Sequence, residues 1–211
     1  MRLSFLVVPA VLMASITASA QWKEYPMPQL GFIVEFPAAP AASTSNYKTM
    51  LVPSAPVHVY SLREGNDLYM ATVTDLLNRK EEGATLLVEA EFNLNLLGDV
   101  TGYSTSRVEP GRDAIFGHFI TINCRSGKTP DQAGQTEAAH AWFKGLTGME
   151  CPNGARLTVN MFFNRGRLYI MHGMSMPDKD DNSFGPNALR FTNSISFYRA
   201  DGTRAPADQV Q

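Results

Sequence analysis

The sequence has few cysteines, almost no net charge and, beyond its first twenty residues, no long hydrophobic run. Two cysteines among 211 residues exclude a disulfide-rich scaffold and a four-cysteine metal site. Lysine and arginine number 18 against 20 aspartates and glutamates, so composition gives no basis for binding nucleic acid or an anionic membrane. Hydrophobic residues make up 44% of the chain, which excludes wholesale disorder. The sequence therefore predicts a folded, globular protein.

The one long apolar run lies at the N-terminus. A positive charge is followed by an almost entirely apolar stretch over 3–16, and Ala18 and Ala20 form an A-x-A cleavage pattern. This order is typical of a secretory signal peptide, and the run is too short for a membrane anchor. We expect residues 1–20 to be a signal peptide, cleaved before Gln21. The mature protein is then periplasmic or secreted, without stable membrane insertion.

Export also bears on the two cysteines, Cys124 and Cys151. An oxidising compartment favours a disulfide between them, which would close a loop of about 28 residues. The bracketed segment 125–150 is polar and is flanked by apolar runs, so we expect an insert loop there. Two free buried thiols are the alternative. Two cysteines without nearby histidine or CxxC spacing cannot complete a tetrahedral metal site.

The mature chain reads as short strands with two helices interposed, over 21–200, followed by a polar tail over 201–211. Leu86, Ala90 and Leu94 recur at helical spacing, which predicts a helix over 81–97 with Gly98 as its cap. A second helix follows Ser183. The predicted strands cover 22–25, 32–36, 45–51, 57–63, 68–74, 100–108, 114–123, 156–163 and 168–176.

The late strands are apolar on both faces, as in the middle of a sheet covered on both sides. Turn sequences at 64–67 and 164–167 predict antiparallel hairpins between the strands beside them. These features predict the α+β class, with one domain built on a mainly antiparallel sheet flanked by helices.

Several short segments resemble one family, the exported bacterial PsbP/DcrB-like domains. Trp22-Lys-Glu-Tyr25 and Gly31-Phe-Ile-Val-Glu-Phe-Pro37 are similar to the family's opening motif, and Arg190-Phe-Thr-Asn-Ser-Ile-Ser-Phe197 is similar to its closing one. The stretches 111–117 and 167–170 recur there in the same order. The resemblance implies a twisted antiparallel sheet in an α-β-α sandwich, and a role as an accessory, assembly or binding module. The insert at 125–150 departs from the family pattern.

Candidate binding residues concentrate in the insert, where aromatic side chains stand beside charged ones. They are Lys128, His140, Trp142 and Lys144. Whether Trp142 packs inward or presents a binding face is open from the sequence. We expect no cofactor and no bound metal.

Two histidines, His118 and His172, fall on predicted central strands and could act only where they meet a carboxylate. Packing within the core is the ordinary interpretation of such residues. Whether the two converge is also open.

These observations favour a non-catalytic accessory or binding module of the cell envelope, with an envelope protein or a small ligand as its partner. A hydrolytic or metal-dependent enzyme that uses the buried histidines is one alternative. A structural assembly factor is another. The sequence names no ligand.

Overall fold

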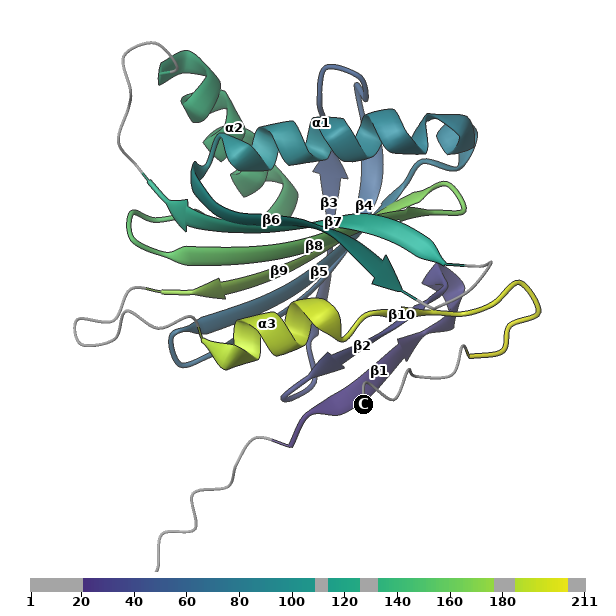
Figure 1. Ribbon diagram of the computed structural model, residues 1–211. Coiled ribbons are helices and arrows are strands. Elements are labelled where there is room, and N and C mark those ends of the chain that lie inside the picture. The colour runs from purple at the N-terminus through teal and green to yellow at the C-terminus, as the bar shows by residue number, and fades with distance from the viewer. Residues whose placement is uncertain (1–20, 109–113, 126–132, 177–184, 205–211) are drawn as a thin grey trace, which may run out of the picture.

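An antiparallel sheet of seven strands forms the centre of the molecule (Figure 1). The computed structural model describes residues 21–108, 114–125, 133–176 and 185–204, so the predicted signal peptide at 1–20 lies outside the described residues. Helices α1 and α2 cover one face of this sheet. The other face carries α3 and a second sheet of three strands (Figure 1). The α+β class, with a mainly antiparallel sheet flanked by helices, is confirmed.

The strands of the large sheet follow a spatial order that differs from their order in the chain. That order is β3 (Ala41–Tyr47), β4 (Ala55–Glu64), β5 (Asp67–Asp75), β9 (Arg167–Ser175), β8 (Arg156–Asn164), β7 (Ile115–Cys124) and β6 (Gly98–Val108). The small sheet contains β1 (Lys23–Met27), β2 (Phe32–Phe36) and β10 (Ser196–Phe197). The helices are α1 (Gly83–Asn95), α2 (Ala133–Thr147) and α3 (Pro186–Asn193), with short 3-10 turns η1 (Pro28–Leu30) and η2 (Leu77–Glu82).

The hairpins predicted at 64–67 and 164–167 are confirmed by the strand register, because β4 pairs with β5 and β8 with β9, each antiparallel. β6 and β7 are also antiparallel neighbours. β8 is buried over six consecutive residues and β9 over seven, because helices or strands cover both faces of the sheet at its centre.

Alternating side chains of the central strands fill two separate cores. Leu157, Ile170 and Met174 point toward α1 and α2, where they pack with Leu86 and Phe143. The intervening residues pack on the other face against α3 and the small sheet. That second core is rich in aromatic rings, and its members include Phe32, Phe36, Tyr69, Phe162, Tyr169, Phe191 and Phe197.

Some element boundaries differ from the sequence-based expectation. The strand expected over 45–51 is β3, which ends at Tyr47, and α1 ends with Leu96 as its C-cap rather than Gly98. Gly98 instead begins β6, where a Cβ would lie 2.0 Å from the Asn123 carbonyl oxygen. A close approach of two strands, and not a helix cap, requires glycine there.

A similar close approach fixes α3 on the sheet. A Cβ at Gly173 would lie 2.6 Å from the Ala188 carbonyl oxygen and 2.9 Å from its Cα, so the helix backbone rests directly on the strand. We expect Gly173→Ala to lower the free energy of unfolding by about 1–3 kcal/mol, because the helix must shift outward. Urea denaturation measures the change.

A matched control is Gly145→Ala in α2, where a Cβ meets nothing within 4 Å. Helix propensity there favours alanine over glycine by about 0.5–1 kcal/mol, so this variant should be slightly more stable than the wild type. Equal effects of the two substitutions would show that α3 does not depend on the missing side chain of Gly173.

Candidate functional site

The two cysteines form a disulfide at the base of α2. Cys124 ends β7 and Cys151 follows α2, with their Cα atoms 5.5 Å apart. Residues 133–147 of the predicted insert loop form this helix rather than a loop. Ala139, Phe143 and Leu146 supply the reason, since they recur at helical spacing and are buried against the large sheet.

The three described candidate binding residues of the insert, His140, Trp142 and Lys144, each have different neighbours. Trp142 is half-buried and packs edge-on against Tyr47, with ring centroids 6.0 Å apart. On the outer side of α2, a ring nitrogen of His140 lies 3.2 Å from the Arg125 carbonyl oxygen. Lys144 donates a 2.7 Å hydrogen bond to Glu150, which lowers the pKa of that carboxyl group. Lys128 lies outside the described residues.

The two histidines of the central strands have separate environments. His172 on β9 is fully buried beneath α2, where its ring packs edge-on against Phe143. Its Nε2 lies 3.4 Å from the Thr72 hydroxyl, and its Nδ1 is buried without a hydrogen-bond partner among the described residues. Burial lowers the pKa of His172 to about 3, so the ring is neutral at physiological pH.

His118 on β7 is the histidine that meets a carboxylate. Its Nδ1 lies 2.5 Å from Glu91 of α1, and both side chains are about one-fifth exposed. β8 separates β7 from β9 in the sheet, so His118 and His172 do not form one site. The edge of the Tyr103 ring packs against His118, with centroids 5.8 Å apart.

This histidine lies within a surface rich in exposed apolar side chains, which sequence reasoning missed. Val88, Phe92, Val100, Tyr103 and Phe116 are 43–63% exposed, which makes them five of the nine strongly exposed large hydrophobic residues in the described part of the chain. We call these five residues the aromatic face. Scattered exposed apolar residues are ordinary, whereas a shared patch is typical of an interaction surface.

Strand register places the members from β6 and β7 on one side of the sheet. Tyr103 lies opposite Ile120, and Val100 lies opposite Ile122. Residues opposite one another in an antiparallel pair share a face, and both isoleucines belong to the core beneath α1. Phe116 is on the same face, because it precedes His118 by two residues along β7.

The α1 residues join the same surface through Glu91. The Glu91–His118 contact ties α1 to β7, and Val88 lies three residues before Glu91 on the same side of the helix. Phe92 follows one turn beyond Val88, on the side of α1 that faces away from the sheet. The guanidinium of Arg107 lies over the Phe116 ring, 5.6 Å from its centroid, at the border of the face.

The aromatic face adjoins a sheet edge. β6 is the last strand of the large sheet, and among the described residues no strand pairs with its outer side. α2 lies against one end of the opposite edge strand, β3, where the Ser45 hydroxyl donates a 2.6 Å hydrogen bond to the Gly145 carbonyl oxygen, while Ala41–Thr44 are exposed. Among the described residues neither edge strand pairs with a further strand, and β6 is the edge that adjoins the exposed apolar side chains.

Two further properties bear on the kind of site. Within the described ranges, no three histidine, cysteine, aspartate or glutamate side chains lie close enough to hold a metal ion. None of the helices in the described part of the chain is long and apolar enough to cross a membrane. No protein-family model and no curated protein matches the chain.

Proposed function

We propose that this protein is a non-catalytic accessory module of the cell envelope, and that it binds an extended segment of a partner protein at β6 and the aromatic face. The observation that carries this proposal is the outer edge of β6, which pairs with no strand in the described part of the chain, beside the exposed apolar side chains of β6 and β7. The predicted signal peptide and the resemblance to PsbP/DcrB-like domains support an exported role. The disulfide supports it as well, because such bonds persist in oxidising compartments.

An extended segment is the occupant that fits this edge best. An unpaired edge strand offers backbone N–H and C=O groups in a row, which an added strand satisfies while its alternate side chains contact the neighbouring surface. β6 is 11 residues long and carries no charged residue from Val100 to Ser106. Charged side chains at intervals are a common protection of exposed edges, and this stretch lacks them.

The Glu91–His118 pair is the feature that would suit the enzymatic alternative. A carboxylate that orients a histidine is one part of several catalytic sites. A catalytic histidine also needs access to substrate, and the Tyr103 ring packs against that of His118. We therefore assign the pair a structural role, in which it holds α1 to β7 at the centre of the aromatic face.

Photocrosslinking in cells that produce the full chain tests this proposal. Benzoylphenylalanine is placed at Tyr103, at Phe116 or, as a control, at Leu189, which is 46% exposed on α3 across the sheet. We expect Tyr103 and Phe116 to capture the same partner at one extended segment, and Leu189 not to capture it. Phe116→Ser should reduce capture from Tyr103 about tenfold, because one exposed aromatic contact on the same face is lost.

The outcomes separate the occupants of the surface. Crosslinks that map to β6 of a second copy of this chain would show that the surface mediates self-association and does not bind a different protein. Capture from Tyr103 and Phe116 no greater than from Leu189 would show that the aromatic face is not a binding surface.

A further inference from the structure

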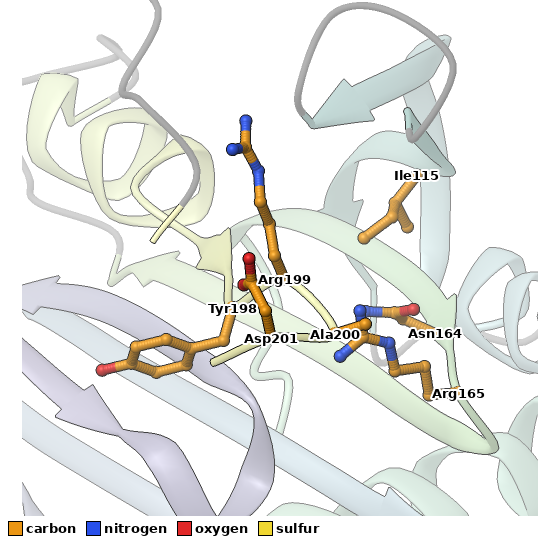
Figure 2. A pocket seen from close by; sticks show the side chains of 7 residues that line it. All are labelled: Ile115, Asn164, Arg165, Tyr198, Arg199, Ala200 and Asp201. Atoms are coloured by element: carbon orange, nitrogen blue, oxygen red, sulfur yellow. The ribbon is translucent and has the colours of Figure 1, made fainter. Parts of the chain in front are cut away.

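A cavity lies on the opposite side of the large sheet, between the β8–β9 turn and the segment that follows β10 (Figure 2). Its volume is about 450 Å³. A neighbouring cavity of about 250 Å³ shares Asn164, Arg165, Tyr198 and Arg199 and extends to Tyr169. We call the two cavities together the arginine pocket.

Backbone hydrogen bonds hold both walls of the arginine pocket in place. Leu76 donates a 2.8 Å hydrogen bond to the Gly166 carbonyl oxygen, which fixes the β8–β9 turn against the segment leading into η2. On the other wall, Tyr198 donates to the Gly31 carbonyl oxygen at 3.1 Å, and Arg199 donates to that of Thr203 at 2.8 Å. Hydrogen bonds within the chain therefore fix both walls of the pocket.

Arg165 stands at a backbone position that disfavours it. Its φ of 51° is the one positive φ among the described non-glycine residues, and Gly166 follows with φ of 78°. Two consecutive positive φ values are the pattern of type I′ hairpin turns, which prefer asparagine, aspartate or glycine at the first of these positions. An arginine there costs about 1 kcal/mol relative to those residues. A residue held in such a conformation is a reason to look for a function of its side chain.

The charges around the pocket leave Arg165 uncompensated. No carboxylate within the described ranges lies within 4 Å of its guanidinium, whereas Arg167 beside it donates a 2.7 Å hydrogen bond to Asp75. In Figure 2 the Arg165 side chain extends toward Ala200, and Arg199 extends away from it. Hydrogen bonds from Thr203 and the charge of Arg199 lower the pKa of Asp201, so this lining residue is ionised.

We propose that the arginine pocket binds a carboxylate-bearing ligand, with the carboxylate against the guanidinium of Arg165 and the amide of Asn164. A planar guanidinium matches a carboxylate with two parallel hydrogen bonds. Arg165 and Arg199 together with the ionised Asp201 give this lining one net positive charge, which suits a monoanion better than a phosphate dianion. Ile115, Tyr198 and Tyr169 give the rest of the ligand apolar surface. The pocket and the aromatic face are separate sites on opposite sides of the sheet.

Titration calorimetry with defined probes tests this proposal on the full chain. The probes are an acetylated Ala-Ala-Phe peptide with a free C-terminal carboxylate, the same peptide as its C-terminal amide, 3-phenylpropanoate and inorganic phosphate. We expect both carboxylates to bind saturably, and the amide and phosphate to bind at least about tenfold more weakly. Tighter binding of the peptide acid identifies a protein C-terminus as the source of the carboxylate. Tighter binding of 3-phenylpropanoate identifies a free organic acid.

The decisive variant is Arg165→Asn, which removes the charge and places a preferred residue in the turn. We expect it to lose carboxylate binding about tenfold or more while its melting temperature stays at or above that of the wild type. The matched control is Arg63→Asn, an exposed arginine next to the opposite end of the sheet, which should bind like the wild type. Equal binding of acid and amide, tighter binding of phosphate, or unchanged binding by Arg165→Asn would each overturn the proposal.

Discussion

Acidification from pH 6.5 to pH 3 is expected to lower the free energy of unfolding by about 4–5 kcal/mol through His172 alone. This loss is comparable with the whole stability of a small domain, which is about 5–15 kcal/mol. It arises because the folded protein keeps the ring neutral over a pH range in which the unfolded chain binds a proton.

The cause is the position of His172 in the centre of the sheet. The ring is covered by α2, and Phe143 of that helix packs against it. Its nearest polar neighbour is the Thr72 hydroxyl at 3.4 Å, which offers little stabilisation to a positive charge. Desolvation therefore disfavours the imidazolium form and lowers the pKa from 6.5 to about 3.

The direction of the effect follows from the two pKa values. Above pH 6.5 both states carry a neutral ring, and His172 adds no pH dependence. Between pH 6.5 and pH 3 only the unfolded chain takes up the proton, so stability falls by about 1.4 kcal/mol for each pH unit. Carboxyl groups add their own dependence at acidic pH, and a variant is needed to isolate the contribution of the histidine.

Urea denaturation of His172→Met between pH 7 and pH 4 measures that contribution. We expect the variant to lose stability on acidification less steeply than the wild type, by up to about 1.4 kcal/mol per pH unit. Met174→Leu is the matched control, because it perturbs the same core two residues along β9 without a titratable group. This control should keep the wild-type slope. Equal slopes for all three proteins would show that His172 does not remain neutral in the folded state.

The buried strands and their hairpins could be predicted from the sequence because their signals are local. Unbroken apolar runs in β8 and β9 identify strands covered on both sides, and the turn residues between them fix the hairpin. β10, with only Ser196 and Phe197, has no such signal. It forms because its register with β2 buries Phe197 in the aromatic core, which is a tertiary effect.

The helix α2 was missed for a different reason. Its glycines, threonines and glutamine give it the composition of a loop, and the sequence argument gave composition more weight than period. The spacing of Ala139, Phe143 and Leu146 is the signal that identifies its buried side. The same spacing argues for an inward Trp142, one residue before Phe143, which the structure places half-buried against Tyr47.

The surfaces proposed for binding depend on which strands become neighbours. The aromatic face takes residues from α1, β6 and β7, and no local pattern in the sequence brings these three elements together. The arginine pocket likewise joins the β8–β9 turn to residues 198–201, the last of which, Asp201, begins the segment expected to be a polar tail. Asp201 to Arg204 instead form a turn that returns to Tyr198, and residues 205–211 lie outside the described residues.

Removal of the disulfide is expected to lower the free energy of unfolding by about 3–4 kcal/mol. The bond between Cys124 and Cys151 closes a segment with a sequence separation of 27, and in the chain-entropy model a loop of this length restricts the unfolded chain by about that amount. Cys124→Ala combined with Cys151→Ala should lower the melting temperature by about 10 °C. Calorimetry and urea denaturation measure the two quantities.

We expect the disulfide to stabilise the protein mainly by restricting the unfolded chain, and only to a small extent by holding α2 on the sheet. Phe143 and Leu146 are buried against the sheet, and backbone hydrogen bonds between Cys124 and residues 154–155 do not involve the sulfur atoms, so we expect α2 to stay docked without the bond. The far-ultraviolet circular dichroism of the variant should therefore match that of the wild type.

Wild-type protein refolded under reducing conditions is the control, since it lacks the bond but keeps both thiols. If the free energies of unfolding of the reduced wild type and the variant agree within about 1 kcal/mol, the loss comes from the missing chain constraint and not from the smaller side chains. If α2 amides exchange freely in both proteins, the disulfide instead holds the helix on the sheet, and the entropic explanation is wrong.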